Sequence, residues 1–189
     1  MSTILQVVLI IFLVVVFYLV VHMSKKPSAS SASKSLYNRL GGIYAIAAVV
    51  NRFSDRLLSN PVVGVHSPNQ FLRDWSLQNS VDAPENTKSR LPGLKWMRIA
   101  WLVDVSGGPM HFFSTHGASP ATNLTNAHCP LRITEAEFAA VAAELAATLD
   151  EFKVPSREKD EVLLAFGKHM QEVTAGSRGD VCARSSIAP

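Results

Sequence analysis

The longest hydrophobic run of the chain lies at its N-terminus, from Ile4 to Val21, and Gln6 is its only polar residue. An α-helix rises about 1.5 Å per residue, so roughly 20 apolar residues cross the ~30 Å hydrocarbon core of a bilayer. We therefore expect one transmembrane helix over residues 3–23. Lys25 and Lys26 follow directly, and basic flanks stay on the cytoplasmic side of a membrane. The pattern predicts a single-pass anchor with a cytoplasmic body.

A removed secretory signal is the alternative interpretation of this run, and it would export the body. Signals begin with basic residues and end at small residues where they are cleaved. No Lys or Arg precedes the run, and His22, Met23 and Ser24 make a poor cleavage site. The flanks therefore favour the uncleaved anchor over the signal.

Beyond the anchor, apolar positions recur every three or four residues, which is the period of an amphipathic α-helix. We expect helices at 36–40, 43–59, 91–105, 123–129, 134–152 and 156–173. Thr134 and Glu137 match a capping box at the start of the fifth helix, and Ser156 is the expected cap of the last. The segment 62–89 is expected to be irregular. Strand signals are weak, so the pattern predicts an all-α fold.

Three polar or breaking segments divide the chain further. Residues 24–35 are rich in serine and read as a flexible linker. Double glycines at 41–42 and 107–108 interrupt the helical pattern. Residues 176–189 show no apolar period and are expected to form a disordered tail. One domain is therefore predicted at 36–175.

Composition narrows the class of partner. The formal net charge is +3, and the basic residues are scattered rather than gathered with aromatic residues. We therefore predict no nucleic-acid binding. The two cysteines, Cys129 and Cys182, belong to no C-x-x-C pair, so we expect neither a zinc site nor a disulfide between them.

Four motifs occur in order along the body. They are SLYNRLGG (35–42, followed by AIAAVVNRFSDRLLSNP at 45–61), SGGP (106–109), AHCPLRIT (127–134) and FKVPSREKDEVL (152–163). Together they resemble group I truncated haemoglobins over most of the body. The resemblance implies a two-over-two helical sandwich around a b-type haem, preceded here by the transmembrane helix.

The resemblance implies that His128 ligates the haem iron, which makes it the metal ligand of the chain. A neutral imidazole is a suitable ligand for haem iron and leaves the sixth position open to gas. The alternative is an ordinary histidine bonded to a backbone carbonyl. His111 and His116, in a predicted loop, are weaker candidates for a distal ligand or metal site, and solvated loop histidines are the favoured interpretation there.

The resemblance implies that the distal helix, counted back from Gly107, presents Leu94, Arg98 and Trp101 toward the haem. The spacing of four and then three places these residues on one helix face. Met97 flanks that face. Arg98 can donate hydrogen bonds to bound dioxygen or to an anion, or it can reach outward to a haem propionate or to solvent. Lys95 has the same propionate interpretation, with exposed surface charge as its alternative.

One position of the predicted helix 43–59 departs from the family pattern. Phe53 is expected to contact the haem, but the next residue is Ser54, where the family usually has a tyrosine that stabilises bound dioxygen. Arg98 or Trp101 then supplies the donor, or ligand affinity is weak.

The long connection 62–89 hides the phenylalanine that usually wedges against the haem. Phe71 is our candidate for that residue, and Trp75 is the second choice. Ordinary core filling is the alternative for both residues.

These inferences predict a membrane-tethered haem protein that binds dioxygen, nitric oxide or carbon monoxide. Nitric oxide dioxygenation or redox and gas sensing would follow from that chemistry. The chain has no flavin or nicotinamide fingerprint, so turnover would need an external reductant, such as an electron-transfer partner at the membrane. The alternative is a haem-free, globin-like module for interaction or sensing at a membrane.

Overall fold

The computed structural model describes residues 34–80, 83, 90–110 and 124–179. The predicted transmembrane helix at 3–23 and nearly all of the predicted linker lie outside these residues. None of the described helices is both long enough and apolar enough to cross a bilayer. The membrane anchor therefore stays a prediction.

The described residues from Ser35 onward belong to one unit, which contains helices and turns but no strand. The α-helices are α2 (Leu36–Arg39), α3 (Gly42–Ser59), α4 (Gln70–Gln78), α5 (Arg90–Val105), α6 (Leu124–His128), α7 (Glu135–Glu151), α8 (Ser156–Gly167) and α9 (Met170–Val173). A short 3-10 helix, η3 (Cys129–Leu131), follows α6 directly. The all-α prediction is confirmed.

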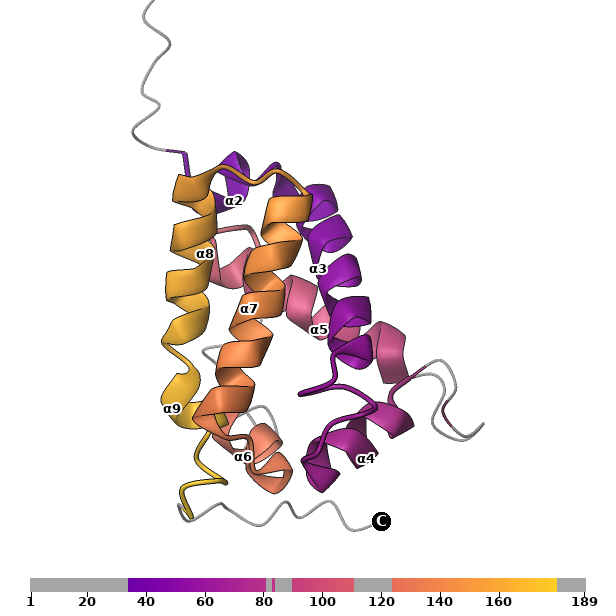
Figure 1. The fold of residues 1–189 in the computed structure, drawn as a ribbon. Coiled ribbons are helices and arrows are strands. Elements are labelled where there is room, and N and C mark those ends of the chain that lie inside the picture. Colours follow the sequence, from indigo (N-terminus) through magenta and orange to yellow (C-terminus); the bar gives the residue numbers. More distant parts are fainter. Residues whose placement is uncertain (1–33, 81–82, 84–89, 111–123, 180–189) are drawn as a thin grey trace, which may run out of the picture. The chain divides into compact units, whose positions relative to one another are not determined.

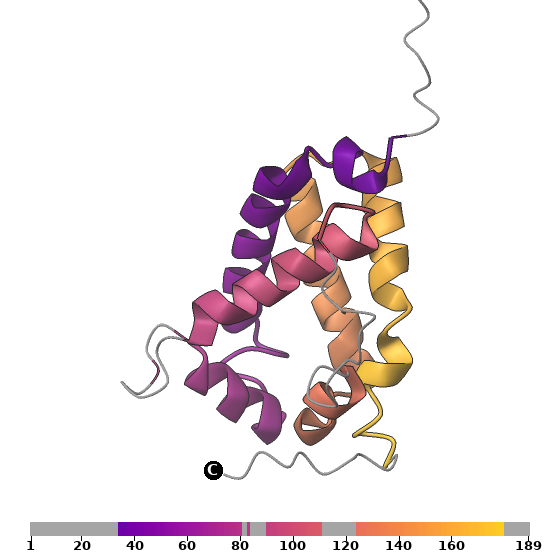
Figure 2. The same cartoon turned by 180° about the vertical axis from the view of Figure 1, so that it is seen from behind.

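Two pairs of long helices build the body. Helix α3 packs against α5, helix α7 packs against α8, and α3 also contacts α7 (Figure 1). Seen from behind, α5 crosses α3 at a steep angle while α7 and α8 run side by side (Figure 2). This is the arrangement of one helix pair over another that the family resemblance implies.

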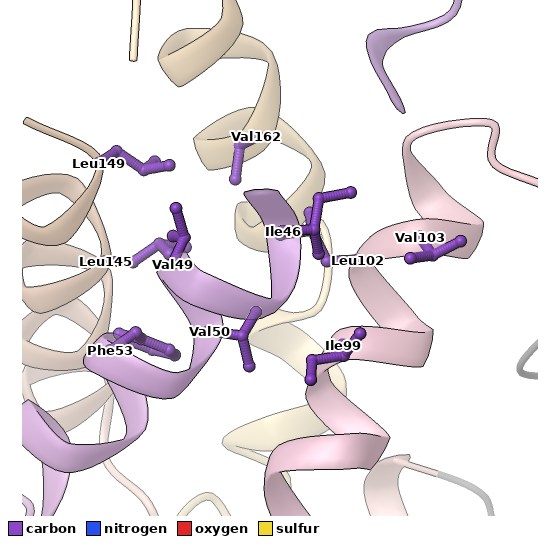
Figure 3. Packing of buried hydrophobic residues seen from close by; sticks show 10 residues of the cluster. All are labelled: Ile46, Val49, Val50, Phe53, Ile99, Leu102, Val103, Leu145, Leu149 and Val162. Atoms are coloured by element: carbon purple, nitrogen blue, oxygen red, sulfur yellow. The ribbon is translucent and has the colours of Figure 1, made fainter. Parts of the chain in front are cut away.

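The core lies where the two pairs meet. Figure 3 shows its buried side chains between α3, α5, α7 and α8. They are Ile46, Val49, Val50, Phe53, Ile99, Leu102, Val103, Leu145, Leu149 and Val162. Each fully buried aliphatic or aromatic side chain contributes about 1.5–3 kcal/mol relative to an exposed one. The predicted three-and-four periodicity of 43–59 thus marks the face that is buried.

Local signals at two helix starts are confirmed. Gly41 and Gly42 have φ of +92° and +77°, left-handed values that glycine adopts without a Cβ penalty, so the chain can turn from α2 into α3. At α7, the Thr134 side chain accepts a hydrogen bond from the Glu137 amide at 3.2 Å. The Glu137 carboxylate accepts one from the Thr134 amide at 2.7 Å, which completes the capping box.

The prediction that 62–89 is irregular is wrong for Gln70–Gln78, which forms α4. The Asn69 side chain caps this helix by accepting from the amides of Phe71 and Leu72. Leu72 is its one buried hydrophobic residue, beside the buried Ser76. A helix this short with one buried apolar position leaves almost no periodic signal, which is why the pattern missed it.

The last predicted helix, 156–173, is broken into α8 and α9. Helix α8 ends at Gly167, and α9 begins at Met170. Glycine is a poor helix former because it loses much backbone freedom when a helix forms. Gly167 therefore favours an end of the helix at this position. Ser156 is the first helical residue and not the cap, which is Pro155 without any side-chain hydrogen bond.

Candidate functional site

A cavity of about 360 Å³ lies among the helices, and most of its lining is apolar. Its size is within the range of ligand pockets, which run from about 300 to 1,000 Å³. Six of the eight predicted site residues line it together: Phe53, Leu94, Met97, Arg98, Trp101 and His128. The structure therefore brings most of the predicted site residues, from α3, α5 and α6, to one cavity.

The other two predicted site residues lie elsewhere. Phe71 is 41% exposed, and the Arg132 guanidinium sits 4.7 Å from the centre of its ring. Lys95 forms an ion pair with Asp55 at 2.6 Å. Trp75, the second choice for the wedging aromatic residue, does line the cavity. Trp75 thus faces the cavity, whereas Phe71, one helix turn earlier, faces outward.

His128 is held so that one ring nitrogen is free. Its Nδ1 lies 2.8 Å from the Leu124 carbonyl oxygen. A carbonyl oxygen can only accept, so Nδ1 carries the proton and Nε2 keeps its lone pair. Burial lowers the pKa of His128 below 6.5, the nearby charge of Arg98 lowers it further, and the bond to Leu124 acts in the opposite direction. The imidazole is therefore neutral and ready to bind a metal.

The chain after His128 is tightly packed. Cys129 is buried, and Arg132 adopts a left-handed conformation with φ of +49° that turns the chain toward α7. Gly176 packs on this segment, where a Cβ would lie 2.1 Å from the Cys129 carbonyl oxygen. The absence of a side chain at Gly176 therefore allows the C-terminal segment to close against the loop that carries His128.

Two expectations are corrected in this segment. Cys129 is disulfide-bonded, although no disulfide was expected. The only other cysteine, Cys182, lies outside the described residues. Residues 176–179, expected to begin a disordered tail, form hydrogen-bonded turns in which the Ser177 amide donates to the Thr174 carbonyl at 3.1 Å.

On the opposite wall, Arg98 turns into the protein. Its Nη1 donates a hydrogen bond to the Ser54 hydroxyl oxygen at 2.9 Å, which joins α5 to α3. Ser54 is completely buried. Burial also lowers the pKa of Arg98 to about 10. The guanidinium thus contacts Ser54, the position at which the resemblance implies a tyrosine, and its charge lies at a mostly apolar cavity.

Trp101 has its donor engaged. Its indole Nε1 donates to His169 Nε2 at 3.3 Å, and His169 Nδ1 lies 2.8 Å from a carboxylate oxygen of Glu172. Because Nε2 accepts from the indole, Nδ1 is the protonated nitrogen that donates to Glu172. Of the two predicted distal donors, Arg98 is therefore the one with unused N–H groups.

His169 lines the cavity, and the sequence analysis did not select it. The signal was present, because Phe166, His169 and Val173 follow at spacings of three and four, and all three line the cavity. The break after Gly167 obscured this face.

A haem iron needs few protein ligands. Among the described residues, no three His, Cys, Asp or Glu side chains gather closely enough to hold a metal ion by themselves. A haem iron, in contrast, can be held by one imidazole. His111 and His116 lie outside the described residues, so their candidacy stays a prediction.

Comparison with known families identifies the fold. A family model described as bacterial-like globin matches residues 77–175, more than half of the chain. The chain belongs to the bacterial-like globin family. Within this globin, the match includes α5, which carries Arg98 and Trp101, and α6, which carries His128. No curated protein matches the chain.

Solved structures extend the match over the whole body of the globin. The truncated haemoglobin of Tetrahymena pyriformis in its Fe(III) form is 21% identical, covers 74% of this chain and 97% of its own, and has a TM-score of 0.55. The 2/2 haemoglobin of Synechococcus sp. PCC 7002, in the cyanomet state with covalently attached haem, is 23% identical, covers 75% and 98%, and has a TM-score of 0.56. The predicted truncated globin fold is confirmed.

Proposed function

We propose that this globin binds haem and, at the haem iron, a diatomic gas such as dioxygen, nitric oxide or carbon monoxide. One observation carries the proposal: His128 lines the cavity, and its Nδ1 donates to Leu124 at 2.8 Å, which leaves Nε2 with its lone pair. An imidazole held through its other nitrogen has a fixed tautomer and ring orientation, which suits it to a single axial bond.

The cavity fits a haem in its chemistry. Its lining is mostly apolar, which suits a flat porphyrin, and the polar side chains of Arg98 and Ser54 line it together with His128. A bound haem would supply the gas-binding and redox chemistry. The chain would supply the axial nitrogen, the apolar walls and a hydrogen-bond donor.

Finer features of the proposal rest on the sequence. We propose a group I truncated haemoglobin in which a bound haem b would supply nitric oxide dioxygenase chemistry, with electrons from an external reductant. The apolar residues 3–23 support a cytoplasmic globin tethered to a membrane, near an electron-transfer partner or in contact with gases that partition into lipid. Gas or redox sensing is the other role that such a protein could serve.

A visible spectrum of the purified full-length chain tests the proposal. We expect a Soret band in the ferric, ferrous and carbonmonoxy states, and a pyridine haemochrome assay that identifies the haem type. Colourless protein, made with ample haem, would instead leave the haem-free interaction or sensor module as the function.

The ligand assignment has its own test. His128→Ala is expected to lose most of the haem or to shift its spectrum strongly, because the axial nitrogen is gone. His66→Ala is the matched control, since His66 is an exposed histidine. A His128→Ala protein with full haem content and an unchanged spectrum would reject His128 as the ligand.

A further inference from the structure

Arg98 places a positive charge in an apolar cavity with little to balance it. Its Ser54 partner is neutral, and no carboxylate of the described residues forms an ion pair with it. Isolated buried charges are strongly unfavourable, and proteins normally pair them or bind a counter-ion. Arg39 and Arg56, in contrast, have carboxylate partners.

The geometry leaves donors for a ligand. A guanidinium has five N–H donors, and Arg98 has one of them on the Ser54 oxygen. The bond joins residues 44 positions apart on α5 and α3, so it fixes the direction in which the guanidinium points. Trp101 cannot compete for the same ligand while its indole donates to His169.

The charge of Arg98 also shares its cavity with the predicted iron ligand. Arg98 and His128 line the same cavity. A small ligand bound in this cavity would therefore lie in the field of Arg98. A charge-assisted hydrogen bond is about twice as strong as a neutral one, so the ligand that gains most is an anion.

We propose that Arg98, oriented by Ser54, forms an anion-binding subsite that makes this globin favour small inorganic monoanions, such as azide, fluoride or nitrite, over neutral ligands. The subsite rests on the proposed haem function, because the anion would be bound in the cavity that His128 lines. A carboxylate of the haem itself offers the same chemistry from a second source, and the experiment separates the two.

The main test is a spectral titration of the ferric full-length protein with azide and fluoride, beside carbon monoxide binding to the ferrous form. In Arg98→Met we expect anion affinity to fall by about 10- to 100-fold, the scale of one charge-assisted hydrogen bond. Carbon monoxide affinity should change by less than about threefold, because that neutral ligand gains little from a cation.

Two further variants separate charge from structure. Arg98→Lys keeps the charge and should recover part of the anion affinity, whereas Arg98→Gln keeps a neutral donor and should not. Ser54→Ala tests the positioning role and is expected to weaken anion binding less than Arg98→Met. Thermal unfolding followed by circular dichroism shows that each variant is folded.

A second arm uses haem dimethyl ester, which lacks the carboxylates. If Arg98 binds an external anion, the loss in Arg98→Met persists with the ester. If the loss disappears with the ester, Arg98 pairs with the haem carboxylate and the proposal is overturned. Equal anion affinity in wild type and Arg98→Met, within about twofold, overturns it as well.

Failure of the haem assignment gives a different result. A protein without a Soret band rejects the proposed function, and the subsite is then tested on the haem-free chain. At constant ionic strength, azide should raise the unfolding temperature of the wild type but not of Arg98→Met. No such difference would overturn the subsite in its own right.

Discussion

Two regions of the cavity lining, here called the long wall and the short wall, are built in opposite ways, and residues of α4, α7 and α8 also line the cavity. One wall consists of α3 and α5, long helices that pack directly on each other and share the main core. The other consists of α6, η3 and α9, which are short and contact each other at the end of the body. The first wall is positioned by buried apolar faces, and the second by single close contacts such as that of Gly176.

The walls also differ in charge. The α3–α5 wall holds the Arg98 guanidinium, whereas the α6 wall holds the neutral imidazole of His128. The cavity therefore contains a cation and a nitrogen with a free lone pair, and these two groups suit an electron-rich ligand and a metal. The long helices thus hold an unfavourable charge in place, and the short segments hold a nucleophilic nitrogen that needs exact orientation.

The largest expected effect breaks the short wall. Gly176→Ala would force a Cβ to within 2.1 Å of the Cys129 carbonyl oxygen, so the backbone must move. We expect the free energy of unfolding to fall by about 3 kcal/mol, at the upper end of overpacking effects. Urea denaturation measures it. The control is Gly167→Ala, where nothing lies within 4 Å, and equal losses in both variants would contradict the close-contact argument.

On the long wall we expect a gain in stability. Arg98→Met removes a buried charge that has no described carboxylate partner, so the unfolding free energy of the haem-free protein should rise by about 1 kcal/mol or more. Lys95→Met is the matched control on the same helix, and loss of its partly exposed pair with Asp55 should change stability by less than about 1 kcal/mol. Destabilisation by Arg98→Met would mean that the charge is balanced after all.

A smaller effect is expected from the hydrogen bond between Trp101 and His169. Trp101→Phe keeps an aromatic ring but loses the hydrogen bond to His169. We expect the free energy of unfolding, measured by thermal unfolding, to fall by about 1 kcal/mol. Trp96→Phe, at an exposed position of the same helix, should stay within about 0.5 kcal/mol of wild type. Equal effects of the two substitutions would show that the bond adds nothing.

The smallest effect concerns pH. The pKa of His128 in the folded protein lies below 6.5, its value in the unfolded chain. At a pH between the folded-state pKa and 6.5, the unfolded chain therefore binds more protons than the folded protein. The free energy of unfolding of the haem-free protein should therefore keep its full value above pH 6.5. It should decline as the pH falls from 6.5 toward the folded-state pKa of His128. Denaturation curves at several pH values measure this slope. His128→Gln should flatten it, and His66→Gln should leave it unchanged.

Much of the fold could be predicted because its signals are local. The apolar period of 43–59, the glycines that end α2 and the capping box at Thr134 each act within a few residues, and the structure contains all three. Helix α4 and the break between α8 and α9 lacked such signals. The candidate site was found through motifs, which placed six of its residues in one cavity but set Phe71 where Trp75 lies.

The sequence by itself determined which helix faces are apolar and that His128 precedes a capped helix. Only the tertiary structure decided that Arg98 turns to Ser54, that Trp101 turns to His169, and that Gly176 closes on Cys129. The physical reason is distance along the chain. Periodicity and capping are short-range properties, whereas these partners lie 44 and 68 residues apart in the two hydrogen bonds and meet only after the helices have crossed.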